Sequence, residues 1–171
     1  MNGRVLDGSL REQSAFANPL WQVADFVRTI RRRLRFGQLS RSPLQLLRLE
    51  LRGEVVECEW MVRPGDAWDT TLRPRERERN ISEQALRDAI RMRDLIFGAL
   101  PEVETAVLRA FRPWAAREPP ELVIAGVVTR DARYVFRVSS LVMRAKLYGF
   151  QFYLHQGALQ RLQLKESQMT F

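Results

Sequence analysis

Apolar residues recur at helical spacing between residues 19 and 36. Asn18 precedes Pro19, a pair typical of a helix N-cap and first turn, and Gly37 ends the pattern. The spacing predicts an amphipathic helix over 19–36, preceded by a loose arm over 1–17. The predicted apolar stripe consists of Leu20, Val23, Ala24, Val27, Ile30 and Leu34.

Apolar and polar residues then alternate in two segments, 47–51 and 56–62. A period of two is typical of half-buried strands, and the short connection around Gly53 favours an antiparallel hairpin. Because an even register keeps apolar residues opposite one another, we predict a two-residue loop, Gly53-Glu54 or Arg52-Gly53. The residues predicted to face the core are Leu47, Leu49, Leu51, Val56, Cys58 and Trp60.

A charged segment and a second helix follow the hairpin. Residues 67–80, which contain the run RPRERER, show no period and are predicted to form an exposed loop. Asn80 and Glu83 have the spacing of a capping box, which predicts a helix from Asn80 to near Leu100. The predicted apolar face of this helix is Ala85, Leu86, Ala89, Ile90, Ile96 and Phe97.

The C-terminal part of the chain predicts two strands, a helix and a hairpin. Segments 103–112 and 122–129 are rich in β-branched and apolar residues. Two serines at 139–140 and a glycine at 149 bracket a third helix. Segments 150–155 and 158–164 predict a final hairpin that turns at Gln156-Gly157, whereas 133–138 fits either an edge strand or the opening of a helix.

This order of elements predicts an α+β fold. Consecutive strands joined by short loops favour an antiparallel sheet built from strand-strand-helix units, with the helices mainly on one face and the N-terminal amphipathic helix in front. We expect one domain over 18–164 and a loose tail over 165–171. The two units share a pattern but no residue motif, so an internal duplication stays open.

Composition excludes several classes of protein. The chain has 171 residues, 46% hydrophobic and 28% charged, which is typical of one globular domain and not of a collagen or a disordered chain. One cysteine and one histidine exclude an intramolecular disulfide and a Cys/His zinc cluster. No long apolar run is present, so we expect no transmembrane segment and a cytoplasmic location. We also expect no cofactor.

Charge adds a candidate binding surface. Lys and Arg outnumber Asp and Glu by 28 to 20, and residues 1–42 alone hold eight arginines. On the predicted helix 19–36, one side carries Trp21, Arg28, Arg31, Arg32 and Arg35. Such a face can contact phosphates or an anionic membrane surface, can meet a partner protein, or can simply be solvated with Asp25 and Arg28 paired.

Three further residues are candidates for binding. Arg93 projects into the middle of the apolar face of the second helix, so its guanidinium requires a carboxylate partner or an interface. Trp68 and Trp114 fall in predicted loops, where a large aromatic side chain either folds back on the domain or anchors a partner.

Carboxylates cluster on the outward face of the first hairpin. Glu50, Glu57 and Glu59, with Asp66 and Asp69 beyond them, could hold Mg²⁺ for phosphodiester hydrolysis. Arg48 and Arg52 share that face, and cross-strand pairing explains the pattern without a metal. We expect Cys58 to be a buried thiol and His155 to have a surface or capping role.

Three functions remain open at this point. The sequence favours a non-enzymatic binding or assembly module that recognises a partner protein or a second copy of itself. The alternative is a nucleic-acid-binding protein that uses the basic side of the helix 19–36. The third is a metal-dependent nuclease on the glutamate face. No motif in the sequence identifies a specific partner.

Overall fold

The computed structural model describes residues 24–30, 32, 42–113, 118–131 and 135–163. Residues 24–30 and 32 are helical, while the rest of the predicted helix 19–36, the arm 1–17 and the tail 165–171 lie outside the described residues. The elements that follow are β1 (Gln45–Arg52), β2 (Val55–Met61), the 3₁₀ helix η1 (Ala67–Thr71), α2 (Pro74–Ala99), β3 (Thr105–Arg112), β4 (Glu121–Thr129), the 3₁₀ helix η2 (Val135–Arg137), α3 (Leu141–Leu147), β5 (Phe150–Gln151), β6 (Tyr153–His155) and β7 (Ala158–Gln160).

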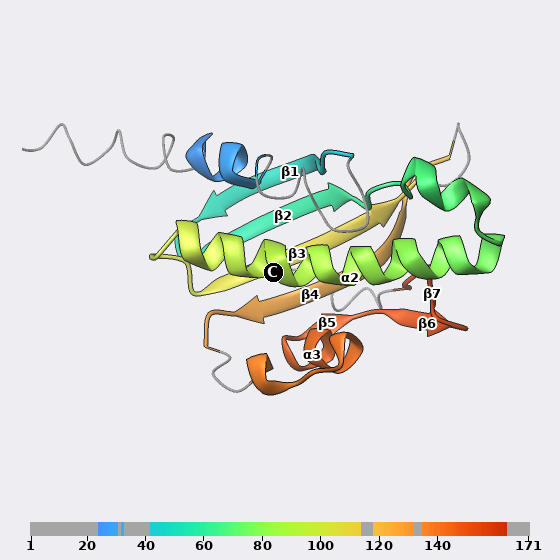
Figure 1. Ribbon diagram of the computed structural model, residues 1–171. Helices are drawn as coiled ribbons and strands as arrows, with labels where there is room; N and C mark the ends of the chain where they lie inside the picture. The colour runs from blue at the N-terminus through green and yellow to red at the C-terminus, as the bar shows by residue number, and fades with distance from the viewer. Residues whose placement is uncertain (1–23, 31, 33–41, 114–117, 132–134, 164–171) are drawn as a thin grey trace, which may run out of the picture.

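The fold is mixed α and β, with a five-stranded sheet in the order β1-β2-β3-β4-β5 and a two-stranded sheet of β6 and β7. The prediction of an entirely antiparallel sheet is wrong at one pairing, because β2 and β3 run parallel. The chain leaves β2, crosses the sheet as α2 and re-enters as β3 (Figure 1). A helical crossover of this kind is what brings parallel strands side by side.

The first hairpin has the predicted antiparallel pairing and a two-residue loop, since Arg52 is opposite Val55. Leu49 is opposite Cys58 and Leu51 is opposite Val56, as the alternation requires. Leu47 is the exception, because a bulge between Leu46 and Arg48 leaves its side chain 43% exposed. Leu46 takes the expected place of Leu47 opposite Trp60 and packs against the core.

Helix α2 begins at Pro74, six residues before the predicted start at Asn80. The prediction of an exposed loop over 67–80 is therefore wrong, since this stretch forms η1 and the first turns of α2. Proline at the first position of a helix loses no hydrogen bond and has a suitable φ angle. The run RPRERER is helical from Pro74 onward, and none of the buried residues of α2 falls in it.

The core lies between α2 and the face of the sheet that α2 crosses (Figure 1). We call this face the inner face and the opposite one the outer face. The buried side chains of the inner face come from alternate strand positions, and those of α2 include every residue of its predicted apolar stripe. Phe26 and Ile30 of the N-terminal helical residues join the same core. Ile30 was part of the predicted stripe and Phe26 was not.

The C-terminal elements close the fold. Ser140 caps α3 by accepting a hydrogen bond from the Met143 amide, and Gly149 follows with a φ of 100°, as the sequence predicted. Phe150 and Gln151 pair with β4, so only β6 and β7 form the final hairpin. Beyond β7 the chain crosses the outer face, where the Leu162 amide donates to the Leu122 carbonyl over 2.8 Å.

Candidate functional site

Arg93 is buried, with 7% of its surface exposed, at the junction of α2, the end of β4 and the end of α3. Its guanidinium donates to the Asp94 carboxylate over 2.9 Å and to the carbonyls of Thr129 and Arg130 over 2.8 Å each. The expected carboxylate partner is therefore present in the chain itself. The same guanidinium lies 4.2 Å from the centre of the Tyr148 ring, so Arg93 ties three elements together.

A second buried cation was missed by the sequence analysis. Arg63, directly after β2, donates two hydrogen bonds to Asp88 of α2, over 2.8 and 2.7 Å, and both side chains are buried. Gln84 donates a third hydrogen bond to Asp88 over 2.7 Å. The available signal was Asp88 itself, which lies at helical spacing from the apolar residues Ala85 and Met92.

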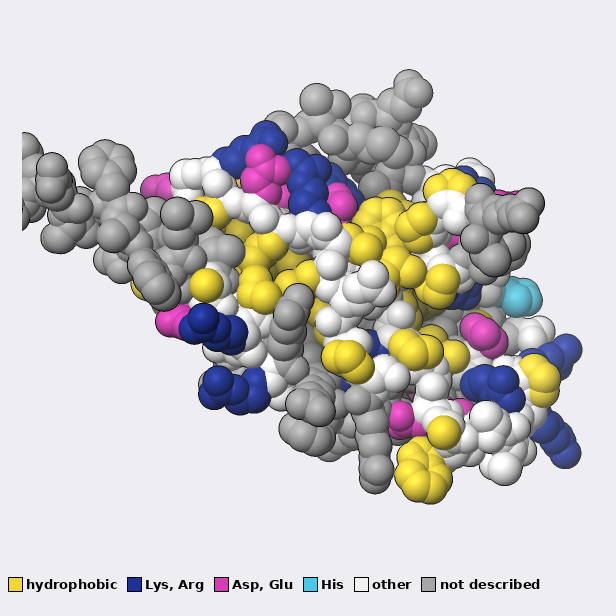
Figure 2. Space-filling view, turned by 90° about the horizontal axis from the view of Figure 1, so that it is seen from above, with side chains coloured by type: hydrophobic (Ala, Val, Ile, Leu, Met, Phe, Trp, Pro, Cys, Tyr) yellow, Lys and Arg dark blue, Asp and Glu magenta, His cyan; other side chains and the backbone are white. Residues whose placement is uncertain are grey.

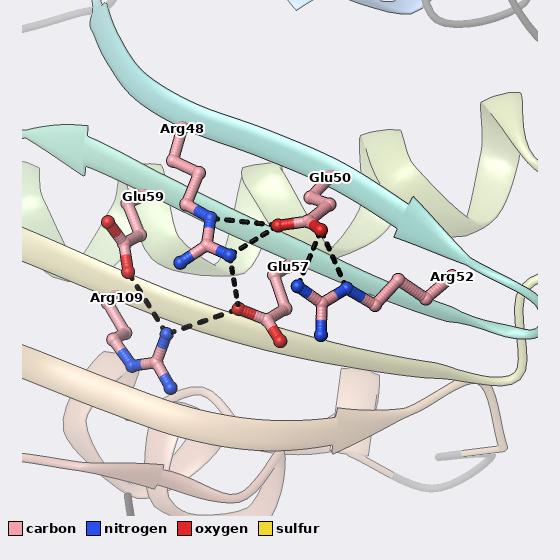
Figure 3. A network of polar contacts seen from close by, with 6 residues as sticks. All are labelled: Arg48, Glu50, Arg52, Glu57, Glu59 and Arg109. Atoms are coloured by element: carbon pink, nitrogen blue, oxygen red, sulfur yellow. Dashed lines mark hydrogen bonds and ion pairs between the residues drawn. The ribbon is translucent and has the colours of Figure 1, made fainter. Parts of the chain in front are cut away.

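Six charged residues from three strands form a network on the outer face, the side of the sheet away from α2 (Figure 3). Arg48 and Arg52 both donate to Glu50, the second over 2.6 Å. Arg109 donates to Glu59 over 3.0 Å. Arg48 and Arg109 also lie 3.7 Å from Glu57, which links the two halves of the network.

In this network the glutamates of the outer face are paired with arginines. The hydrogen bond from Arg48 is the main cause that holds the pKa of Glu50 below its usual range, and the hydrogen bond from Arg52 adds to it. Each glutamate that the sequence offered as a metal ligand has a guanidinium as partner. The pairing across strands that the sequence offered as the alternative is therefore present.

A groove runs along the outer face between the network and the C-terminal segment 161–163. It has a volume of about 740 Å³ and is lined by arginines and by apolar residues, which are interspersed along β3 and the C-terminal segment. Figure 2, seen from above β1, shows basic and acidic side chains gathered beside a hydrophobic area. The residues of this outer-face groove are Arg48, Arg52, Glu57, Val107, Arg109, Phe111, Leu122, Arg161, Leu162 and Gln163.

The remaining candidates of the sequence analysis are dispersed. Arg28 is exposed and pairs with Asp25 over 3.2 Å, and Arg32 is also exposed, whereas Arg93 is interior. Trp68 lies in η1 with 66% of its surface exposed. The other predicted binding residues lie outside the described residues: Trp21, Arg31, Arg35 and Trp114.

The two single residues with reactive side chains have different surroundings. Cys58 is fully buried in the core, and this burial raises the pKa of its thiol to about 12. A protonated thiol without access to solvent is a poor nucleophile. His155 is exposed at the end of β6. Both placements agree with the sequence analysis.

The sequence matches no known family model, and it has no match among curated proteins or solved structures. None of the helices in the described part of the chain combines the length and apolar character needed to cross a membrane. The same residues contain no group of three or more His, Cys, Asp or Glu side chains placed to hold a metal ion. The geometry of the surface is therefore the evidence that bears on the function of this protein.

Proposed function

We propose that this protein is a non-enzymatic binding module that holds an extended segment of a partner protein in the outer-face groove. The observation that carries the proposal is the groove itself. In the described part of the chain, no helix covers the outer face, and the groove of about 740 Å³ is lined by both arginine and apolar side chains. A hollow lined by these two kinds of side chain is typical of a recognition site.

The chain itself supports an extended occupant. Residues 161–163 already lie against this face, with the Leu162 amide bonded to the Leu122 carbonyl and the Leu162 side chain half-buried. The outer face therefore accepts a non-helical segment through one backbone hydrogen bond and one apolar contact. A partner segment beside 161–163 would use the same kinds of interaction.

The charges of the groove favour an acidic partner. Four arginines line it, against the single glutamate Glu57. Arg161 makes no ion pair with any described residue, whereas Arg48 and Arg52 already pair with Glu50 and Arg109 already pairs with Glu59. An aspartate or glutamate side chain of a partner would give Arg161 a carboxylate to pair with.

The apolar residues of the groove set a second requirement for the partner segment. The walls of the groove include the half-buried Phe111, Leu122 and Leu162 and the already buried Val107, and Val127 on the same face is 42% exposed. Covering such residues contributes free energy in proportion to the apolar area removed from water. We therefore expect the partner segment to alternate acidic and large apolar side chains, as an extended strand does.

A peptide-display selection on the immobilised full-length protein tests the proposal. We expect enrichment of peptides in which acidic residues alternate with Leu, Ile or Phe. The dissociation constant of one enriched peptide is then measured by fluorescence anisotropy. The substitution Arg161→Glu should raise that constant about tenfold or more, because it replaces an attraction with a repulsion.

Arg75→Glu is the matched control, since Arg75 is an exposed arginine on α2 and does not line the groove. It should change the dissociation constant by about twofold at most, as expected for a distant surface charge. Enriched peptides without acidic residues, or equal affinity for wild type and Arg161→Glu, would refute the groove as the binding site. A second copy of this chain as occupant would instead appear as a concentration-dependent dimer in sedimentation equilibrium.

A further inference from the structure

A second hollow, separate from the outer-face groove, opens between α2 and α3. Its volume is about 630 Å³. Arg87 and Arg91 enter it from α2, and Arg144 enters it from α3. Residues four apart on a helix share a face, so the two arginines of α2 stand next to each other. Three guanidiniums therefore border one space.

The nearby carboxylates pair with Arg87 and with two buried arginines, and none of them makes an ion pair with Arg91 or Arg144. Glu83 is paired with Arg87, and Asp94 receives a hydrogen bond from the buried Arg93. Asp88 of α2 accepts two hydrogen bonds from Arg63, and it also feels the charge of Arg91 without being bonded to it. Every described carboxylate of this region thus has an arginine of its own.

Arg91 and Arg144 remain without such a partner. Neither makes an ion pair or a side-chain hydrogen bond with any described residue. The Nε atom of Arg144 is buried and lacks a hydrogen-bond partner among these residues. A buried hydrogen-bond donor without an acceptor costs free energy. The guanidiniums that line the cleft also repel one another. An anion in the cleft would reduce that repulsion.

We propose that the cleft between α2 and α3 binds a phosphate monoester of about mononucleotide size. Arg91 and Arg144 hold the phosphate, because a guanidinium fork matches the spacing of two phosphate oxygens. Arg87 adds a third positive charge at the rim. A cleft of about 630 Å³ falls within the range of small-molecule sites.

The other walls explain why the ligand carries a ring as well as a phosphate. Ile90 and Leu141 contribute apolar surface, and Tyr148 contributes an aromatic ring. Arg93 fixes that ring from one side, with its guanidinium carbon 4.2 Å from the ring centre. Arg93 is therefore a positioning residue for the cleft, and the phosphate-bearing molecule contacts Tyr148 and not Arg93 itself.

Isothermal titration calorimetry of the full chain tests the site with four probes: AMP, ribose 5-phosphate, adenosine and inorganic phosphate. We expect AMP to bind most tightly and adenosine to bind at least about tenfold more weakly, because it lacks the phosphate. Ribose 5-phosphate and inorganic phosphate should fall between them. Equal affinity for AMP and adenosine would overturn the proposed role of the arginines.

Two substitutions, Arg91→Gln and Arg144→Gln, remove one guanidinium each without changing the side-chain length greatly. Each should weaken AMP binding about tenfold while changing the melting temperature of the free protein only slightly, since neither arginine makes an ion pair or a side-chain hydrogen bond with a described residue. Arg75→Gln is the matched control and should bind AMP as wild type does. No AMP binding to wild type at millimolar concentration, or wild-type affinity in both variants, would refute the site.

The two proposed sites are separable by the same variants. Arg144→Gln should keep the peptide affinity of the outer-face groove, and Arg161→Glu should keep AMP binding. Loss of both activities in either variant would show a general effect on folding and would count against the separate cleft.

Discussion

Arg63 and Asp88 are a fully buried ion pair between the end of β2 and α2. Removing two charges from water is expensive, and two guanidinium hydrogen bonds with a third from Gln84 offset that penalty. Burial is the largest influence on Asp88 and raises the pKa of its carboxyl, against the lowering effect of Arg63. Removal of either side chain alone therefore leaves the other charge buried without its partner.

Arg63→Met should destabilise the protein by about 3–5 kcal/mol, because it leaves the Asp88 carboxylate buried without its guanidinium. The double variant Arg63→Met with Asp88→Leu should recover most of that loss. Urea unfolding of the wild type, both single variants and the double variant gives the four free energies of unfolding.

The pH dependence of Arg63→Met provides a further check. Without Arg63 the pKa of Asp88 rises further, so the folded state binds a proton more tightly than the unfolded state. The loss of stability should therefore shrink as pH falls through that raised pKa and be largest at neutral pH. A loss that is small and independent of pH would contradict the buried-charge explanation.

The C-terminal end of α2 is contacted by the side chain of Arg130, the residue directly after β4. The Arg130 guanidinium donates to the carbonyls of Phe97, Leu100 and Val103 over 2.8, 2.7 and 2.6 Å. The last carbonyls of a helix have no partner within the helix, and a cation at this end also interacts favourably with the helix dipole. One side chain thus joins the C-terminal end of α2 to the end of β4.

Arg130→Met should lower the free energy of unfolding by about 2–3 kcal/mol, because several carbonyls lose a charged donor. Arg75→Met, near the N-terminal end of the same helix, is the control. Removing a positive charge there should leave stability unchanged or raise it slightly, since cations are unfavourable at a helix N-terminus. Chemical denaturation measures both, and equal effects would mean that Arg130 does not act through the helix end.

For the whole molecule, the distribution of the net charge of +8 matters more than its size. Many arginines are occupied inside the fold or on the outer face, by carboxylates or by carbonyls. Arg28 and Arg32 are both exposed on the described helical residues 24–30 and 32, and Arg28 is paired with Asp25, whereas Arg32 makes no ion pair with a described residue. Nucleic-acid binding through this helix stays a prediction with a distinct salt signature.

We expect only weak binding of mixed-sequence duplex DNA at about 0.15 M salt, where phosphate contacts are strongly screened. If Arg28 and Arg32 contact phosphates, replacing both with alanine should reduce the log–log salt slope by nearly two. Anisotropy titrations at several salt concentrations measure this slope. Tight binding at physiological salt that the double variant abolishes would place nucleic acid ahead of a protein partner.

Local pattern determined a large part of this protein. Alternation predicted the pairing of Leu49 with Cys58, and helical spacing predicted the buried face of α2 and the caps of α3. These features follow from backbone periods and caps that involve residues close in sequence. Pro74 was also a local signal for the start of α2, but the absence of an apolar period in the charged run concealed it.

The tertiary structure decided what depends on residues far apart in sequence. The parallel pairing of β2 with β3 depends on where α2 crosses, and the exchange of Leu46 for Leu47 depends on a bulge in the pairing of two strands. The partners of Arg63 and Arg93 and both surface hollows arise the same way, because each combines side chains from distant elements. A sequence period specifies which side of an element is apolar, whereas the path of the chain selects the element that meets it.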